Sequence, residues 1–383
     1  MSRRKIILGA VSLVIATVIL TSGAFIYLLH AYSGDAASTL RLFRALQIIQ
    51  SRYVETTSVE SLMTGAIKGM VSSLGDPHSI YMDPKMLKDF MVETEGSFGG
   101  VGIVLGAKDK VLTVISPIEG TPGEKAGIAS GDAIIKINGQ DTKNMALDEA
   151  VSKIRGVEGT QVTLTVLRGQ VVKDYTLTRS NIQIKTVSAK MLPDKVGYLR
   201  IAMFNEQTYN EFTKKYQELE QEGMKSIILD LRGNPGGMLD ASVKIANKFV
   251  PKGPIVSVIN REGKQETSNS SLEAVKYPCV VLVDEGSASA SEIVAGAIQD
   301  TGSGTLVGTK TYGKGSVQTI LKLDGGAAMK LTIAKYYTPN GRSINGVGIE
   351  PDVHIELPKK VEGTVLQDTQ LDKAVEVIKS KMQ

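Results

Sequence analysis

Strand and helix patterns alternate along the chain after about residue 185. The strand-like stretches KVGYLRIAMF, SIILDLR and CVVLVDE are separated by stretches with helical spacing, such as EQTYNEFTKKYQELEQEG and LDASVKIANKFV. Strands separated by helices form βαβ units, in which the strands lie parallel in one sheet and the helices pack on it. The alternation therefore predicts an α/β core with a largely parallel sheet, which we assign to residues 184–358.

Residues 91–183 have a different pattern, in which glycines separate short alternating stretches typical of antiparallel strands. The stretches include GSFGGVGIVLG, GDAIIKING and TQVTLTVLR, with one helical pattern, ALDEAVSKIRG, between them. A glycine-rich loop can aim successive backbone N–H groups at a carboxylate. The strand after the loop, at about residues 102–105, could then pair with an incoming peptide. From the loop alone, a glycine hairpin without a ligand remains the alternative.

The N-terminus predicts a membrane segment. Three cations at positions 3–5 precede an uncharged, largely apolar run over residues 6–29. A bilayer core needs about 20 apolar residues in a helix, and the cations favour an N-terminus that stays inside. We therefore expect residues 1–38 to hold a cytoplasmic stub, a single-pass signal anchor and a linker. Secretion after cleavage near the small residues at positions 31–36 is the alternative.

Two further helical segments flank these domains. Residues 39–90 predict a small helical module, in which LRLFRALQIIQSRYV has helical spacing and Ser58 begins a second helix that stops near Gly75. In the tail, residues 359–383, the stretch LDKAVEVIKSKMQ predicts a short amphipathic helix. These segments are the candidate contacts of a homo-oligomer, with the first as a dimerisation arm.

Composition excludes several classes of function. A net charge of +4 without a basic block argues against a nucleic-acid partner. Cys279 is the single cysteine, so no internal disulfide can form, and its apolar surroundings predict a buried side chain rather than a catalytic thiol. The sequence contains no HExxH motif and no GxxxxGK[ST] motif. We therefore expect no metal, no cofactor and no ATP hydrolysis by a P-loop.

Three serines alternate in the stretch DEGSASASEI. Ser289 lies where an apolar strand passes into a helix, a turn that exposes the hydroxyl group and aims the first helical N–H groups at a substrate carbonyl. The N–H of Ala290 is then a candidate donor to an oxyanion. A second donor could come from LDLRGNPGG, residues 229–237, for which a plain turn is the alternative. Ser287 and Ser291 are expected to be small residues that shape the turn and start the helix.

A histidine is not the expected base for this serine. The three histidines are His30, His78 and His354, and none lies in a glycine-rich turn or at a helix start. A lysine whose pKa is lowered by desolvation can take the same role. Lys314 lies between two glycines downstream of Ser289 and is the candidate. An ordinary solvated loop lysine is the alternative.

These motifs together resemble a known family. The segment with GSFGGVGIVL, GDAIIKING and the later helix resembles a PDZ domain. With LRGNPGG, SASASEI and YGKGSVQ in this order, the chain resembles the carboxyl-terminal processing peptidases (tail-specific proteases), which are PDZ-containing serine proteases. The resemblance extends from about residue 40 to residue 358. It implies an α/β fold with a crotonase-like protease core and an inserted, mostly β PDZ domain.

The resemblance also implies roles for individual residues. Ser289, the middle serine of SASAS, would be the nucleophile, Lys314 the general base and Gln318 the residue that orients the lysine. Four residues of a straight strand span about 13 Å, so this pairing predicts a bend after the lysine or a glutamine that reaches back. The candidates for the oxyanion hole are Gly236 or Gly237, together with Ala290.

The resemblance further implies the substrate and the compartment. The carboxylate-binding loop of the PDZ domain would consist of Gly99, Gly100, Val101 and Gly102. Substrates would be extracytoplasmic bacterial proteins with accessible C-terminal tails, cleaved without ATP by an enzyme held in the cell membrane. The alternative function is a catalytically silent, membrane-tethered PDZ adaptor. A crotonase-type acyl-transfer or hydratase enzyme is a third reading.

Overall fold

The computed structural model describes residues 3–108, 111–358 and 367–382, and it divides the chain into two units, Met1–Tyr81 and Met82–Gln383. Residues 359–366 of the expected C-terminal tail lie outside the described part. The expected boundary at residue 90 falls inside helix α4 (Pro84–Glu95), which belongs to the second unit.

The first unit begins with a long apolar helix, α1 (Arg3–Ser33). Its segment Ile7–Leu28 has a mean hydropathy of 2.2 and is 0% buried, which fits a membrane span or a signal sequence. The side chain of Ser58 accepts a hydrogen bond from the Ser61 N–H at 3.0 Å, as predicted for a helix start at this position. Two helices and a strand at the unit boundary follow α1: α2 (Ala36–Arg52), α3 (Val59–Ser72) and β1 (Ile80–Met82).

The second unit continues from α4 into a small antiparallel domain. Its main sheet has the strand order β3-β4-β5-β7-β8, with β6 beside β5, while β2 pairs with β9. Buried aliphatic side chains of these strands pack on α6, the helix predicted from ALDEAVSKIRG. The elements are β2 (Ser97–Gly100), β3 (Ile103–Lys108), β4 (Val111–Pro117), α5 (Pro122–Lys125), β5 (Ala133–Ile137), β6 (Gln140–Asp141), α6 (Leu147–Ile154), β7 (Gln161–Arg168), β8 (Val171–Thr178) and β9 (Ser180–Gln183).

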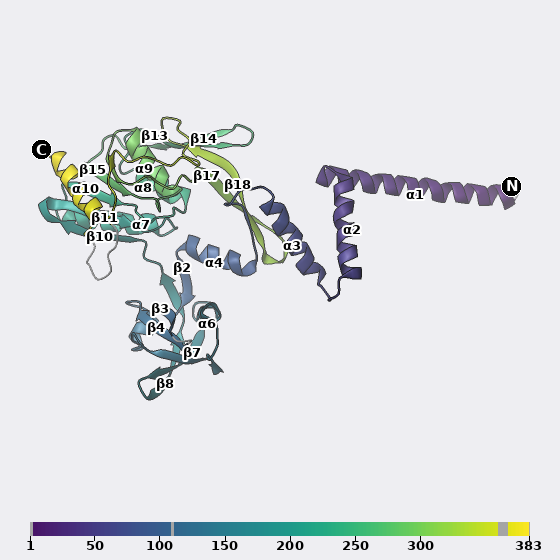
Figure 1. The fold of residues 1–383 in the computed structure, drawn as a ribbon, viewed down its shortest axis with the longest axis horizontal. Helices are drawn as coiled ribbons and strands as arrows, with labels where there is room; N and C mark the ends of the chain where they lie inside the picture. Colours follow the sequence, from purple (N-terminus) through teal and green to yellow (C-terminus); the bar gives the residue numbers. More distant parts are fainter. Residues whose placement is uncertain (1–2, 109–110, 359–366, 383) are drawn as a thin grey trace. The chain divides into compact units, whose positions relative to one another are not determined.

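The remaining chain forms the expected α/β core (Figure 1). Its main sheet has the order β10-β11-β12-β15-β16-β19, and every pair from β11 onward is parallel, as predicted. The elements are β10 (Val187–Leu192), β11 (Val196–Ile201), α7 (Thr208–Gln221), β12 (Ser226–Asp230), α8 (Leu239–Ala246), β15 (Cys279–Val283), α9 (Ala290–Asp300), β16 (Thr305–Gly308), β19 (Val353–His354) and α10 (Thr369–Ser380).

Helices cover both faces of this sheet. Successive strand residues point to opposite faces, so Ile227 of β12 packs with residues of α7, α8 and α9, whereas Ile228 packs with Ala374 and Ile378 of α10. Cys279 of β15 is 1% exposed, as predicted, and burial raises the pKa of its thiol to about 12. The C-terminal helix is therefore an integral layer of the core.

A second, antiparallel sheet lies in the same unit, with β17, β18, β13 and β14 as neighbours in that order. Its strands come from two separate parts of the chain, since β13 pairs Ser257 with Tyr337 of β18. Lys314 lies two residues before the first residue of β17, so this sheet places the lysine-containing turn. The strands are β13 (Gly253–Asn260), β14 (Gln265–Ser270), β17 (Ser316–Lys322) and β18 (Ala328–Tyr337).

Candidate active site

The two glycine-containing turns predicted from the sequence lie side by side. Strands β12 and β15 are parallel neighbours, so their carboxyl ends point to the same edge of the sheet. The turn after β12 (residues 231–237) and the turn after β15 (residues 284–290) meet there, where the Ala288 N–H donates to the Asn234 carbonyl at 3.0 Å. This edge is the place where open α/β sheets bind ligands.

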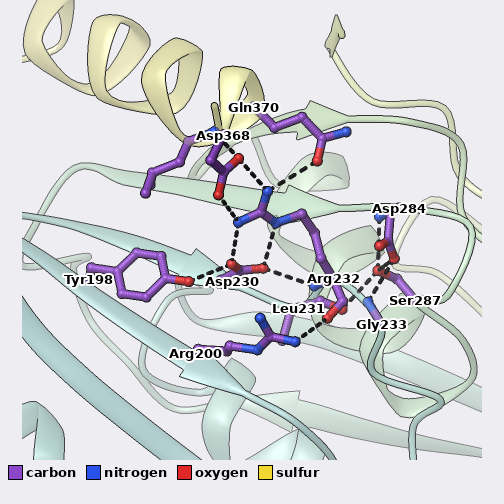
Figure 2. Close-up of polar contacts among 11 residues, drawn as sticks. Tyr198, Arg200, Asp230, Leu231, Arg232, Gly233, Asp284, Ser287, Asp368 and Gln370 are labelled. Carbon is purple, nitrogen blue, oxygen red and sulfur yellow. Dashed lines mark hydrogen bonds and ion pairs between the residues drawn. The ribbon is translucent and has the colours of Figure 1, made fainter. Parts of the chain in front are cut away.

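Ser287 and Ser291 connect these two turns. The Ser287 hydroxyl donates to the Leu231 carbonyl at 2.8 Å (Figure 2), and the Ser291 hydroxyl donates to the Asn234 carbonyl at 3.0 Å. Both serines are fully buried. They shape the turn, as predicted, and they also supply hydrogen bonds that alanine could not supply.

Ser289 has the backbone of a strained turn residue. Its φ of 55° and ψ of −113° place a non-glycine residue in a sparsely populated region. It is the N-cap of α9, so it lies at the helix end whose first N–H groups have no partner within the helix. Strain at a strand-to-helix turn is the geometry that presents a nucleophilic serine.

A buried carboxylate holds both Ser289 and the lysine turn. Glu292 is 0% exposed and accepts the backbone N–H groups of Ser289 at 2.8 Å, Gly313 at 2.7 Å and Lys314 at 2.8 Å. It also accepts the Thr311 hydroxyl at 2.6 Å. Glu292 is not among the residues predicted from the sequence, although the pattern Ser-x-x-Glu at a helix start is a signal for such a contact.

Lys314 lines the same cavity as Ser289. The cavity has a volume of about 500 Å³, and Tyr336 of β18 also lines it. The Tyr336 N–H donates to the Gly315 carbonyl at 3.0 Å, and its hydroxyl donates to the Lys314 carbonyl. Burial and the nearby charge of Glu292 raise the pKa of Tyr336 well above its usual value, partly offset by a hydrogen bond with Ser289. The phenol is therefore a neutral donor at neutral pH.

The rest of the cavity combines an apolar wall with the two turns. Apolar side chains line much of it: Phe90, Met203, Phe204, Pro235, Met238, Leu239, Ala290, Ile293, Val317 and Ile320. The described residues that line it include no histidine. His354 lies in β19 with 59% of its side chain exposed, in keeping with the surface role expected for it.

The backbone of the turn after β12 touches Ser289 directly. Gly236 and Gly237 have φ values of 98° and 137°, which favour glycine. A Cβ atom on Gly236 would lie 2.7 Å from Ser289 Cβ and 2.9 Å from the Ala290 nitrogen. The Gly236 N–H already donates to Asn234 Oδ1 at 2.9 Å. Of the two glycines, Gly237 is therefore the better candidate for the oxyanion hole.

Gln318 lies in β17 and lines the cavity together with Lys314. The pairing of β17 with β18 has an irregularity between Val317 and Gln318, so the strand is not regular at this point. The Gln318 side-chain amide reaches back to donate to the Ser316 hydroxyl at 2.9 Å, and it also donates to the Thr332 hydroxyl at 3.1 Å. The side chain of Gln318 reaches back along the strand, as one of the two expected geometries requires. Its role in orienting Lys314 stays a prediction.

In the antiparallel domain, the predicted carboxylate-binding loop connects β2 to β3. Gly99 and Gly100 belong to β2, and Val101 and Gly102 follow it. A Cβ atom on Gly99 would lie 2.0 Å from the Gly156 carbonyl oxygen, so only glycine fits there. A cavity of about 970 Å³, lined by Gly99, Arg155 and residues of α4, lies beside the loop. The carboxylate-binding role of the four residues stays a prediction.

The strained serine, the facing glycine turn and the lysine in one cavity, together with the antiparallel domain, define the class of PDZ-containing serine peptidases. Family models match three segments of the chain. Residues 195–355 match peptidase family S41, residues 89–167 match the PDZ domain, and residues 30–86 match the N-terminal domain of the activating protease CtpB.

Similar proteins cover most of the chain. The carboxy-terminal processing protease CtpA of Bacillus subtilis (strain 168) is 42% identical over 331 residues, or 86% of this chain and 71% of that protein. A probable CtpA-like serine protease of Staphylococcus aureus (strain MRSA252) is 39% identical over 381 residues, or 96% and 76%. The solved photosystem II D1 C-terminal processing protease is 29% identical, with a TM-score of 0.50, over 85% of this chain and 95% of its own. The chain therefore belongs to the carboxy-terminal processing proteases of peptidase family S41, which confirms the predicted family and fold class.

Proposed function

We propose that this protein is a membrane-anchored, extracytoplasmic serine endopeptidase that uses a dyad of Ser289 and Lys314. It cleaves proteins that it recognises by their C-terminal tails. The observation that carries the proposal is the Glu292 carboxylate, which binds the backbone N–H groups of both Ser289 and Lys314. One buried group thus fixes the nucleophile and the base relative to each other.

The chemistry follows from these positions. Neutral Lys314 takes the proton of the Ser289 hydroxyl, whose oxygen then attacks the carbonyl carbon of the scissile bond. The N–H groups of Gly237 and Ala290 bind the oxyanion. The C–N bond breaks, the leaving amine takes the proton from Lys314, and water hydrolyses the acyl-enzyme. Gln318 orients the lysine in this scheme.

The antiparallel domain would deliver the substrate. Backbone N–H groups of the loop over residues 99–102 bind the terminal carboxylate of a tail, and β3 pairs with the preceding residues. The guanidinium of Arg155, which lies 4.2 Å from the centre of the Phe98 ring, places a positive charge beside this loop. The apolar wall of the active-site cavity suits an apolar side chain next to the scissile bond.

The location of the enzyme follows from α1. We place Ile7–Leu28 across the bacterial cell membrane with the cations at positions 3–5 inside and the peptidase outside. Removal of the segment as a signal peptide is the alternative. A homo-oligomer would form through α2, which buries no residue and exposes Leu40, Phe43 and Ile48. The apolar face of α10, in contrast, is covered by its own core.

Cleavage of a reporter protein with an unstructured C-terminal tail tests the dyad. In the full-length protein in detergent, Ser289→Ala and Lys314→Ala should each lower kcat by more than about 1,000-fold while the fold is kept. The exposed residues Ser271 and Lys310 provide matched controls, and their alanine variants should keep wild-type turnover. Undiminished cleavage by either dyad variant would show the assignment to be wrong. Binding of tails without turnover by the wild type would favour the silent adaptor.

A further inference from the structure

A buried arginine joins the turn after β12 to the C-terminal helix. Arg232 is the second residue of that turn and is 8% exposed. Its guanidinium lies between Asp230, the last residue of β12, and Asp368, the N-cap of α10 (Figure 2). Residues that are far apart in the sequence thus meet directly behind the turn that carries the oxyanion-hole glycines.

Every N–H group of this guanidinium has an acceptor. Arg232 Nε and Nη2 donate to the two carboxylate oxygens of Asp230 at 3.0 and 2.6 Å. Nη1 and Nη2 donate to the two oxygens of Asp368 at 2.7 and 2.9 Å, and Nη1 also donates to Gln370 Oε1 at 3.2 Å. An arginine has five such donors in a rigid plane, so the side chain is fully constrained.

The backbone on either side of Arg232 is attached to the nucleophile turn. The preceding carbonyl, of Leu231, accepts the Ser287 hydroxyl at 2.8 Å, and the following N–H, of Gly233, donates to Asp284 Oδ1 at 2.8 Å (Figure 2). The Arg232 N–H itself donates to Asp230 Oδ1 at 3.0 Å. A shift of the arginine would therefore move both turns of the active site.

The docking of α10 also rests on contacts other than this ion pair. Ala374 and Ile378 already bury the apolar face of the helix, and Lys379 pairs with Asp194 at 2.7 Å near its other end. Burial of charges carries a desolvation cost that often cancels the attraction within an ion pair. A buried arginine with every donor engaged is therefore better explained by precise geometry than by stability.

We propose that Arg232 is a positioning residue for the peptidase reaction. Through Asp230 and Asp368 it fixes the turn of Gly236 and Gly237 against Ser289, and this makes the C-terminal helix part of the catalytic apparatus. The inference rests on the proposed function, because it assumes that this turn contributes to the oxyanion hole. Arg232 acts through the backbone of the turn and does not touch the substrate.

The test compares Arg232→Lys with Asp368→Asn in the full-length protein. Lysine keeps the charge but has a single nitrogen and cannot span two carboxylates. Asparagine at position 368 keeps an oxygen for the helix cap at the Leu371 N–H but loses the charge. We expect kcat to fall by about 10- to 100-fold for the lysine variant and less for the asparagine variant, with KM within about 2-fold.

A peptide aldehyde separates positioning from loss of stability, because it forms a tetrahedral adduct that needs the oxyanion hole. Its affinity should fall by the same factor as kcat, while the affinity of an uncleavable peptide stays unchanged. Lys379→Ala, which breaks the ion pair of α10 with Asp194, is the matched control and should keep wild-type kcat.

The inference would be wrong if Arg232→Lys and Asp368→Asn both kept wild-type kcat while Ser289→Ala was inactive. The proposed dyad of Ser289 and Lys314 would still stand in that case. Cleavage by Ser289→Ala would instead overturn the proposed function. If Arg232→Lys does not fold, Asp368→Asn decides alone. Its kcat and aldehyde affinity must then fall together for the inference to hold.

Discussion

At the scale of single residues, the active site depends on one carboxylate that performs no proton transfer in the proposed mechanism. Glu292 accepts four hydrogen bonds, one from Ser289 and three from the turn that contains Lys314. A carboxylate has two oxygens and can accept all of them at once. A glutamine of the same shape would place an NH₂ group against N–H or O–H donors.

Glu292→Gln should therefore lower both stability and turnover. We expect a loss of about 1–3 kcal/mol in the free energy of unfolding, because buried donors lose their acceptor, and a fall in kcat of about 10-fold or more. Urea unfolding and steady-state cleavage of the tail reporter measure the two effects. Glu285→Gln, at an exposed position in the turn that precedes α9, is the control. Wild-type kcat in the Glu292 variant would contradict a positioning role.

Residue patterns in the sequence predict the two turns and make Ser289 a candidate, because a strand-to-helix turn and a glycine run are local features. Glu292 is harder to predict, since its partners at positions 311–314 lie in a turn whose place is set by tertiary contacts. The pair of Arg232 and Asp368 is separated by 136 residues, and no local pattern indicates it. Side-chain contacts over such distances follow from the assembled fold rather than from spacing.

At the scale of elements, the parallel sheet follows from the alternation of strands and helices. The antiparallel sheet of β13, β14, β17 and β18 does not, because pairing of β13 with β18 joins segments on either side of β15, α9 and β16. The PDZ domain is predictable from the sequence only in part. Hairpins such as β7–β8 join strands that are neighbours in the chain, whereas the contacts of its loops join residues that are far apart in the sequence.

An ion pair in the PDZ domain predicts a dependence of stability on pH. Asp132, which is buried, accepts Arg168 Nε at 2.6 Å and Nη2 at 2.8 Å, and these hydrogen bonds hold the pKa of Asp132 below its usual value of 3.8. A carboxyl group with a lowered pKa stabilises the fold above the unfolded pKa of about 3.9. That contribution is lost as the pH falls through the folded pKa.

Asp132→Asn should accordingly destabilise the PDZ domain by about 2 kcal/mol at pH 7. The difference in the free energy of unfolding between wild type and variant should stay constant down to about pH 5 and shrink below about pH 4. Hydrogen-exchange protection of amides in β5 and β7 measures it, with Asp174→Asn on the exposed side of β8 as the control. If the difference grew on acidification, the Asp132–Arg168 pair would not stabilise the fold in the way proposed.

At the scale of the whole molecule, the proposed function places substrate recognition and cleavage in different domains. A tail that is bound by its carboxylate should lose affinity when that carboxylate is converted to an amide. Loss of one charge-assisted hydrogen bond weakens binding by about 1.5–3 kcal/mol, or about 10- to 100-fold. We therefore expect kcat/KM for an amidated tail to be lower by that factor.

The comparison of free and amidated tails needs a variant whose loop over residues 99–102 cannot bind a carboxylate. Gly99→Val would drive a side chain into the Gly156 carbonyl oxygen, and this variant should cleave free and amidated tails equally slowly. Competition between the two peptides in one reaction, followed by mass spectrometry, measures the ratio. Equal cleavage of both by the wild type would remove the loop from substrate selection.

The packing of α10 against the parallel sheet has a consequence for the order of folding and for self-cleavage. On the Arg232 proposal, the site is complete only when residues 368 and 370 have left the ribosome and packed against β12. Until then, a nascent chain would lack the positioned turn and would stay inactive. Cleavage of the chain on the N-terminal side of α10 would likewise separate Asp368 from Arg232 and lower the activity. The burial of Ala374 and Ile378 in the core holds this helix in place.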